Sequence, residues 1–197
     1  MDKLKQLEQT AKENHVPIMM KDGIEFLTDL VKEKKPKRIL ELGTAIGYSA
    51  IQMARCDEDI EIDTIELDEE RGKQAIQNIL DEQLDHRVHV YLMNIDDYKT
   101  EKKYDLIFVD AAKAQYRRYM EMFMKNLSED GVFVFDNLCF HGMVDDPSLI
   151  KSRQTRQLCR KIRDFRDWLI HEETLECDFR ANIGDGVAVV SVKTENL

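Results

Sequence analysis

Residues 37–49 read KRILELGTAIGYS, an apolar stretch that runs into a loop of small residues. The apolar residues Ile39, Leu40 and Leu42 before the loop predict a buried strand. Gly43 and Gly47 allow a tight turn in which the backbone can approach a ligand closely. Ser49 can cap the helix that follows. A strand, a glycine loop and a helix in this order are typical of an α/β fold that binds a nucleotide-like cofactor.

The spacing of the two glycines narrows the kind of cofactor. G-x-x-x-G differs from the G-x-G-x-x-G of dinucleotide dehydrogenases and from a Walker phosphate loop, so it provides no phosphate cradle. Glu41, just before Gly43, would repel a pyrophosphate but could accept hydrogen bonds from an ammonium group. The motif therefore favours a cofactor with a cationic amino-acid end, although by itself it is equally compatible with a plain strand–helix turn.

A second acidic residue strengthens the cofactor hypothesis. Glu66 lies in the next apolar run, Ile60–Leu67, 19 residues after Gly47. A Rossmann-type fold places a carboxylate at about this separation on the ribose hydroxyls of its ligand. The two runs together predict a nucleoside-binding site.

These motifs resemble those of a known superfamily. ELGTAIGYS at 41–49, followed by TIELD at 64–68, is similar to motifs I and II of the S-adenosylmethionine-dependent methyltransferases, and is nearest to the small metal-dependent O-methyltransferases that include the catechol and caffeoyl-CoA enzymes. The resemblance implies S-adenosylmethionine as cofactor. It implies these cofactor-binding residues: Ile18, Met19, Glu41, Gly43, Ser49, Glu66, Ile95 and Asp110.

Length and composition indicate one globular domain over 1–197. The chain is 43% hydrophobic and 35% charged, with a net charge of −10 that argues against nucleic-acid binding by the whole surface. Its charged start is unlike a signal peptide, and no apolar run approaches the ~20 residues of a membrane span, so we expect a cytoplasmic protein with no membrane contact. Four scattered cysteines without C-x-x-C spacing suggest neither a zinc site nor disulfides.

The apolar patterns predict a Rossmann-like, doubly wound α/β fold, with a mostly parallel seven-stranded sheet and a C-terminal antiparallel hairpin. Five strand–helix repeats precede that hairpin. The resemblance implies that residues 1–35 form helices covering the cofactor site. We expect strands near 39–42, 60–66, 87–92, 104–110, 131–136, 174–179 and 187–192, and helices near 1–14, 23–34, 49–55, 69–83 and 151–166.

Two of the most apolar predicted strands end in an acid. Asp110 closes YDLIFVD, and Asp136 closes GVFVFD and is followed at once by Asn137. The carboxyl ends of parallel strands meet at one edge of a sheet, so these oxygens should converge there. They form a hard ligand set that suits Mg²⁺, Mn²⁺ or Ca²⁺. A single acid at such a position more often caps a helix, but the resemblance assigns all three residues as metal ligands.

Lys113 follows Asp110 by three residues, in DAAK, and both side chains can face one cleft. The resemblance to the catechol enzymes implies that Lys113 is the catalytic base for the attacking hydroxyl. A surface lysine is the alternative. His141 could be a further ligand or base, but it lies where relatives have a variable loop.

A basic helix stands out in this acidic chain. Lys151–Arg166 holds seven basic residues against one acid. On a helix its arginines at 153, 156, 160 and 163 fall within roughly 80° of one another. Such a stripe, Arg153, Arg156, Arg160 and Arg163, can follow a phosphate backbone, although a solvated helix face is the usual explanation of a charge run.

The whole chain most resembles the bacterial tRNA 5-hydroxyuridine methyltransferases. The motifs that carry this resemblance are HVPIM at 15–19, ELGTAIGYSAI at 41–51, FVDAAK at 108–113 and IGDG at 183–186. It implies methylation of a wobble 5-hydroxyuridine, with the tRNA anticodon region as partner, and a homodimer. A small-molecule, catechol-type O-methyltransferase is the alternative, and a non-catalytic cofactor-binding module is a third hypothesis.

Overall fold

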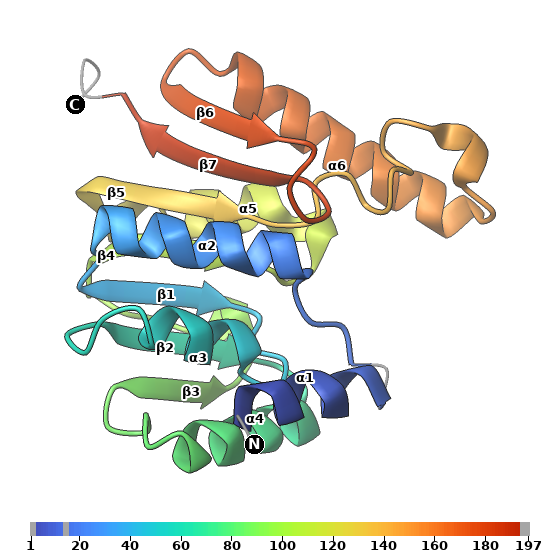
Figure 1. The fold of residues 1–197 in the computed structure, drawn as a ribbon. Helices are drawn as coiled ribbons and strands as arrows, with labels where there is room; N and C mark the ends of the chain where they lie inside the picture. The colour runs from blue at the N-terminus through green and yellow to red at the C-terminus, as the bar shows by residue number, and fades with distance from the viewer. Residues whose placement is uncertain (1–2, 14–15, 194–197) are drawn as a thin grey trace.

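Seven strands form one sheet in a computed structural model that describes residues 3–13 and 16–193 (Figure 1). The strands are β1 (Arg38–Leu42), β2 (Glu61–Glu66), β3 (Val88–Leu92), β4 (Tyr104–Val109), β5 (Leu127–Phe135), β6 (Leu175–Arg180) and β7 (Val187–Val192). Their order is β3-β2-β1-β4-β5-β7-β6. The first five are parallel, and β7 runs antiparallel to both β5 and β6, so the predicted fold class is confirmed.

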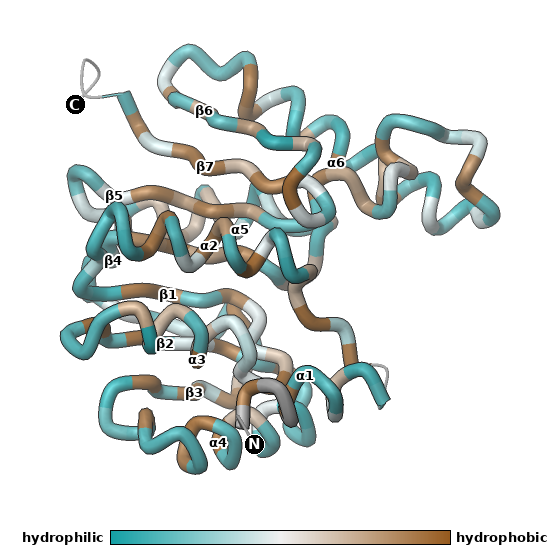
Figure 2. Tube along the Cα trace, viewed as in Figure 1, coloured by the Kyte–Doolittle hydropathy of each residue, from teal (hydrophilic) through white to brown (hydrophobic). Residues whose placement is uncertain are grey.

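Helices cover both faces of this sheet. They are α1 (Lys3–Glu13), α2 (Lys21–Lys34), α3 (Tyr48–Ala54), α4 (Glu69–Asp81), α5 (Tyr116–Phe123) and α6 (Arg153–His171). Apolar residues of α1 to α4 pack on one face, and those of α5 and α6 pack on the other. Figure 2 shows the hydrophobic residues gathered along β1, β5 and β7, between these two layers.

The central strands are buried on both faces, which explains their continuous apolar sequences. Ile39, Leu40 and Leu42 of β1 are each 0% exposed. Burying one such side chain contributes roughly 1.5–3 kcal/mol. The sheet is therefore a rigid support for the loops that leave its carboxyl edge.

Three differences from the sequence prediction of element ends have a clear physical reason. β5 begins at Leu127 instead of near 131, because Leu127 pairs with Tyr104 of β4 ahead of a register shift, and the Ser128 hydroxyl donates to the Tyr104 carbonyl. α6 continues to His171, since its apolar face continues to Leu169. Ser49 does not cap α3: Gly47 holds the N-cap position, at φ 85°, and Ser49 lies inside the helix.

No helix among residues 3–13 and 16–193 combines the length and the apolar character that crossing a bilayer would require.

Gly43 sets the distance between two neighbouring loops. It has φ +102°, and a Cβ at this position would lie 2.2 Å from the carbonyl oxygen of Asp110. The Asp110 amide also donates to the Leu42 carbonyl at 3.0 Å. The loop after β1 and the loop after β4 therefore meet backbone to backbone, with no room for a side chain.

Replacing Gly43 by Ala should lower the free energy of unfolding by about 3 kcal/mol, because strain at positive φ adds to the clash with Asp110. Urea unfolding followed by circular dichroism measures the loss. Gly142→Ala is the matched control: Gly142 also has positive φ, at +75°, but its Cβ would meet only Leu149, at 3.7 Å. That variant should lose about 1 kcal/mol. Equal losses in the two variants would contradict the close approach of the two loops.

Candidate active site

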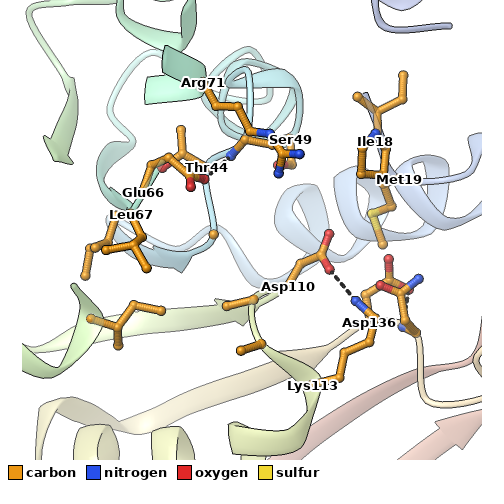
Figure 3. A pocket seen from close by; sticks show the side chains of 18 of the residues that line it. Ile18, Met19, Thr44, Ser49, Glu66, Leu67, Arg71, Asp110, Lys113 and Asp136 are labelled. Atoms are coloured by element: carbon orange, nitrogen blue, oxygen red, sulfur yellow. Dashed lines mark hydrogen bonds and ion pairs between the residues drawn. The ribbon is translucent and has the colours of Figure 1, made fainter. Parts of the chain in front are cut away.

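A pocket of about 390 Å³ opens at the carboxyl ends of β1, β2, β4 and β5. The segment between α1 and α2, with Pro17, Ile18 and Met19, forms one of its walls. Figure 3 shows acidic, basic and apolar side chains from these separate elements pointing into one space. The pocket lies where ligands bind in open α/β sheets.

Most of the predicted site residues line this pocket. They are Ile18, Met19, Gly43, Ser49, Glu66, Ile95, Asp110, Lys113, Asp136 and Asn137. Glu41 and the four arginines are not among the lining residues. The structure thus brings the predicted cofactor, metal and base residues together, while the arginines belong to another surface.

Glu66 is held by backbone amides at one end of the pocket. Its Oε2 accepts a hydrogen bond from the Ala45 amide at 2.7 Å, and its Oε1 accepts one from the Asp68 amide at 2.9 Å. Ala45 adopts positive φ, at 46°, within the loop after β1. The loop after β1 and the Glu66 carboxylate are therefore fixed to each other.

Glu41 lies beneath the pocket instead of in it. It is 0% exposed and accepts hydrogen bonds from the hydroxyls of Ser49 and Thr64. Burial raises the pKa of Glu41 to about 8, although the two hydroxyl donors act in the opposite direction. Ser49 thus stands between Glu41 and the pocket. A cation bound against Ser49 would favour the ionised form of Glu41.

The other end of the pocket holds the predicted metal and base residues. Lys113 Nζ lies 3.4 Å from Asp110 Oδ1. Asp136 is only 2% exposed, and its Oδ1 accepts a hydrogen bond from the Asn137 amide at 2.7 Å. Burial, followed by the negative charge of Asp110, raises the pKa of Asp136 above its usual range. Two acids at this end thus repel each other, with one lysine between them.

These residues fit a divalent cation by the chemistry of their donors. Two carboxylates and an amide supply hard oxygen ligands, and a cation would relieve the repulsion between the acids. Within the described part of the chain, no three His, Cys, Asp or Glu side chains cluster in a metal-binding arrangement. A cation held here would therefore need the amide oxygen of Asn137 as a ligand, and water or substrate would complete the coordination.

Sequence reasoning missed some lining residues, of which Arg71 is the most informative. It enters the pocket from the first turn of α4, and its Nε lies 4.0 Å from Asp68 Oδ2. A helix that follows a parallel strand begins at the ligand-binding edge of the sheet. Arg71 lies five residues after Glu66, in the first turn of that helix, so its position in the sequence could have predicted that it lines the pocket.

The predicted arginine stripe lines a separate groove on α6. The groove has a volume of about 620 Å³ and is lined by all four arginines. Arg163 donates to the Val144 carbonyl, so this guanidinium holds a loop and is not free for a partner. The Arg160 side chain is 82% exposed and lies 3.8 Å from Asp164. Arg153 and Arg156 are also exposed.

His141 has no place in the pocket. Its side chain is 72% exposed, and its Nδ1 lies 3.7 Å from Asp185 Oδ2. The pocket lining does not include it, so the structure gives no support for His141 as a ligand or base.

Known proteins share both the sequence pattern and the fold of this chain. A family model described as O-methyltransferase matches residues 1–193. The chain is 28% identical over 183 residues to the caffeoyl-CoA O-methyltransferase of Medicago sativa, covering 85% of this chain and 72% of that protein.

Two solved structures extend the comparison. One is a Staphylococcus aureus protein provisionally assigned as a caffeoyl-CoA O-methyltransferase, with 34% identity, a TM-score of 0.88 and coverage of 96% of this chain and 92% of that one. The other is a Bacillus cereus O-methyltransferase in complex with S-adenosylhomocysteine, with 25% identity, a TM-score of 0.81 and coverage of 98% and 91%. On the match over residues 1–193, this chain belongs to the O-methyltransferase family.

Proposed function

We propose that this protein transfers a methyl group from S-adenosylmethionine to a hydroxyl whose neighbour on the substrate is a second oxygen, with a divalent cation held by Asp110, Asp136 and Asn137. One observation carries the proposal: a single pocket holds Glu66 at one end and the acid–lysine group at the other. The S-adenosylhomocysteine bound to the Bacillus cereus relative supports the choice of cofactor.

The cofactor is proposed to lie between Glu66 and Ser49. Glu66, fixed by two backbone amides, would accept hydrogen bonds from the ribose hydroxyls. Gly43 leaves the loop backbone free to approach the ligand. Ser49 and the buried Glu41 behind it would face the amino-acid end, where a positive charge favours the ionised carboxylate. Ile18 and Met19 would cover the cofactor from the segment before α2.

The other end of the pocket is proposed to hold the hydroxyl that is methylated. A bound divalent cation supplies positive charge that lowers the pKa of this hydroxyl. Lys113 Nζ, 3.4 Å from Asp110, is within reach of the same space and would take or hold the hydroxyl proton as the oxygen attacks the methyl group. The pocket residues otherwise act by positioning, since transfer requires the oxygen, the methyl carbon and the sulfur in line.

A small catechol-type substrate is the candidate best supported by the relatives. The caffeoyl-CoA enzyme of Medicago sativa is named for a phenolic substrate. Two adjacent oxygens on one ring would reach both a cation at Asp136 and the amine of Lys113. The pocket volume of about 390 Å³ suits a compact reacting group beside a cofactor.

A chelator experiment tests this proposal. Methyl transfer from labelled S-adenosylmethionine to a panel of catechols should require a divalent cation: EDTA should abolish it and excess Mg²⁺ should restore it. The reason is that two carboxylates and an amide bind hard cations reversibly. Full activity in EDTA would contradict the metal site, and binding of cofactor without transfer to any substrate would indicate a non-catalytic module.

A second candidate substrate is 5-hydroxyuridine at the wobble position of tRNA, which would become 5-methoxyuridine. The favouring observation is the exposed Arg153, Arg156 and Arg160 in a chain of net charge −10. Figure 1 shows that the start of α6 and the segment before it extend past the carboxyl ends of the strands, the edge at which the pocket opens. 5-Hydroxyuridine carries its hydroxyl beside a carbonyl oxygen, and an anticodon base can be splayed out of its strand.

Charge reversal tests the second candidate. The variant Arg156→Glu/Arg160→Glu should weaken the binding of tRNA carrying 5-hydroxyuridine by roughly tenfold or more and reduce its salt dependence, because phosphate contacts are lost. The control Lys32→Glu/Lys34→Glu makes the same change in net charge on α2 and should leave tRNA binding unchanged. Filter binding at several salt concentrations measures the tRNA affinity and its salt dependence for each variant. Equal binding by the arginine variant and the wild type would reduce the stripe to a solvated helix face.

A further inference from the structure

The turn between β6 and β7 carries Asp185, a buried acid that lies against the loop after β5. That loop contains Asn137, one of the proposed metal ligands. Asp185 is 7% exposed and does not line the pocket. Its Oδ1 accepts a hydrogen bond from the His141 amide at 2.6 Å, and its Oδ2 lies 3.5 Å from the side-chain Nδ2 of Asn137. A buried carboxylate therefore faces the amide of the one proposed ligand that is not an acid.

The chemistry of the two groups sets which end of the amide faces the pocket. An ionised carboxylate only accepts hydrogen bonds, whereas an asparagine side chain has one accepting oxygen and one donating nitrogen. The reverse orientation would bring two accepting oxygens together beside Asp185 without a proton between them. The Nδ2 of Asn137 must therefore point to Asp185, which leaves its Oδ1 for the pocket.

We infer that Asp185 is a positioning residue that orients the Asn137 side chain so that its oxygen, and not its nitrogen, is presented to a cation. The inference rests on the proposed metal site. A cation binds the oxygen of an amide, and its NH₂ group would repel one, so a half-turn of this side chain would remove a ligand. Groups behind the direct ligands commonly change metal affinity by 10–100-fold.

The backbone around Asn137 is held without the Asp185 side chain. The Leu138 amide donates to the Gly186 carbonyl at 2.9 Å, and the Cys139 amide donates to the Asp185 carbonyl at 2.8 Å. The Asn137 amide donates to Asp136 Oδ1. Substitution of the Asp185 side chain should therefore alter the orientation of the Asn137 amide and leave the loop in place.

The variant Asp185→Asn tests the orientation of Asn137 directly, because the His141 amide also fixes the orientation of the new side chain. The single side-chain oxygen that this substitution leaves at position 185 would accept the hydrogen bond from His141, which directs the new NH₂ group at Asn137. Asn137 would then turn its own oxygen toward position 185 and its nitrogen toward the pocket. Mn²⁺ binding to the full chain, measured by the electron paramagnetic resonance signal of free Mn²⁺, should weaken by about tenfold or more.

The exchanged pair Asp185→Asn/Asn137→Asp tests whether the single variant loses a ligand oxygen at position 137 or loses the packing around it. It keeps the net charge of the pair, and a carboxylate at position 137 presents an oxygen to the pocket in either orientation, so Mn²⁺ affinity should return close to that of the wild type. Asp178→Asn, which removes one exposed acid from β6, is the matched control and should bind Mn²⁺ like the wild type. Thermal unfolding without metal verifies that each variant is folded.

Three outcomes would overturn the inference in distinguishable ways. Wild-type affinity in Asp185→Asn would show that Asp185 does not orient Asn137. Equally weak binding in Asp185→Asn and in the exchanged pair would assign the effect to packing, because the exchanged pair restores both the charge and an oxygen at position 137. Absence of Mn²⁺ binding by the wild-type chain would remove the proposed metal site, and the inference with it.

Discussion

The close approach of Gly43 to Asp110 is the constraint on which the site depends. With no side chain at Gly43, the loop after β1 meets the backbone of the residue that follows β4. The first loop also donates to Glu66 through Ala45, and the second carries Asp110 and Lys113. One backbone contact thus fixes the proposed cofactor end and the proposed metal end relative to each other. Methyl transfer requires such a fixed separation, because the reacting atoms must be in line.

Acidic groups outnumber basic groups at the site. Glu66, Asp110 and Asp136 line the pocket, and Glu41 is buried beneath it. The basic side chains in the lining are Lys113 and Arg71. Burial raises the pKa of both Glu41 and Asp136, which disfavours their ionised forms unless a cation lies beside them. Such a pocket favours positively charged ligands at both ends, a sulfonium cofactor with its ammonium group at one and a divalent cation at the other. This balance agrees with membership of the O-methyltransferase family.

The sequence was sufficient to predict the fold and ten of the residues that line the pocket. Strands buried on both faces leave continuous apolar runs, and the polar residues just after such runs must meet at one edge. For Glu41 and Arg163 the sequence did not predict which group each side chain contacts. Whether Glu41 faces a ligand depends on Ser49 and Thr64, and whether Arg163 is free depends on the Val144 carbonyl 19 residues away. Such partners are set by tertiary packing, which local spacing does not encode.

The decisive measurement is diffraction from crystals grown with S-adenosylhomocysteine and Mn²⁺, with anomalous data to locate the metal. We expect one Mn²⁺ peak at coordination distance from oxygens of Asp110, Asp136 and Asn137, and the ribose hydroxyls against Glu66. A metal peak elsewhere, or a nucleoside bound outside this pocket, would contradict the proposal that one pocket holds the cofactor and the cation side by side.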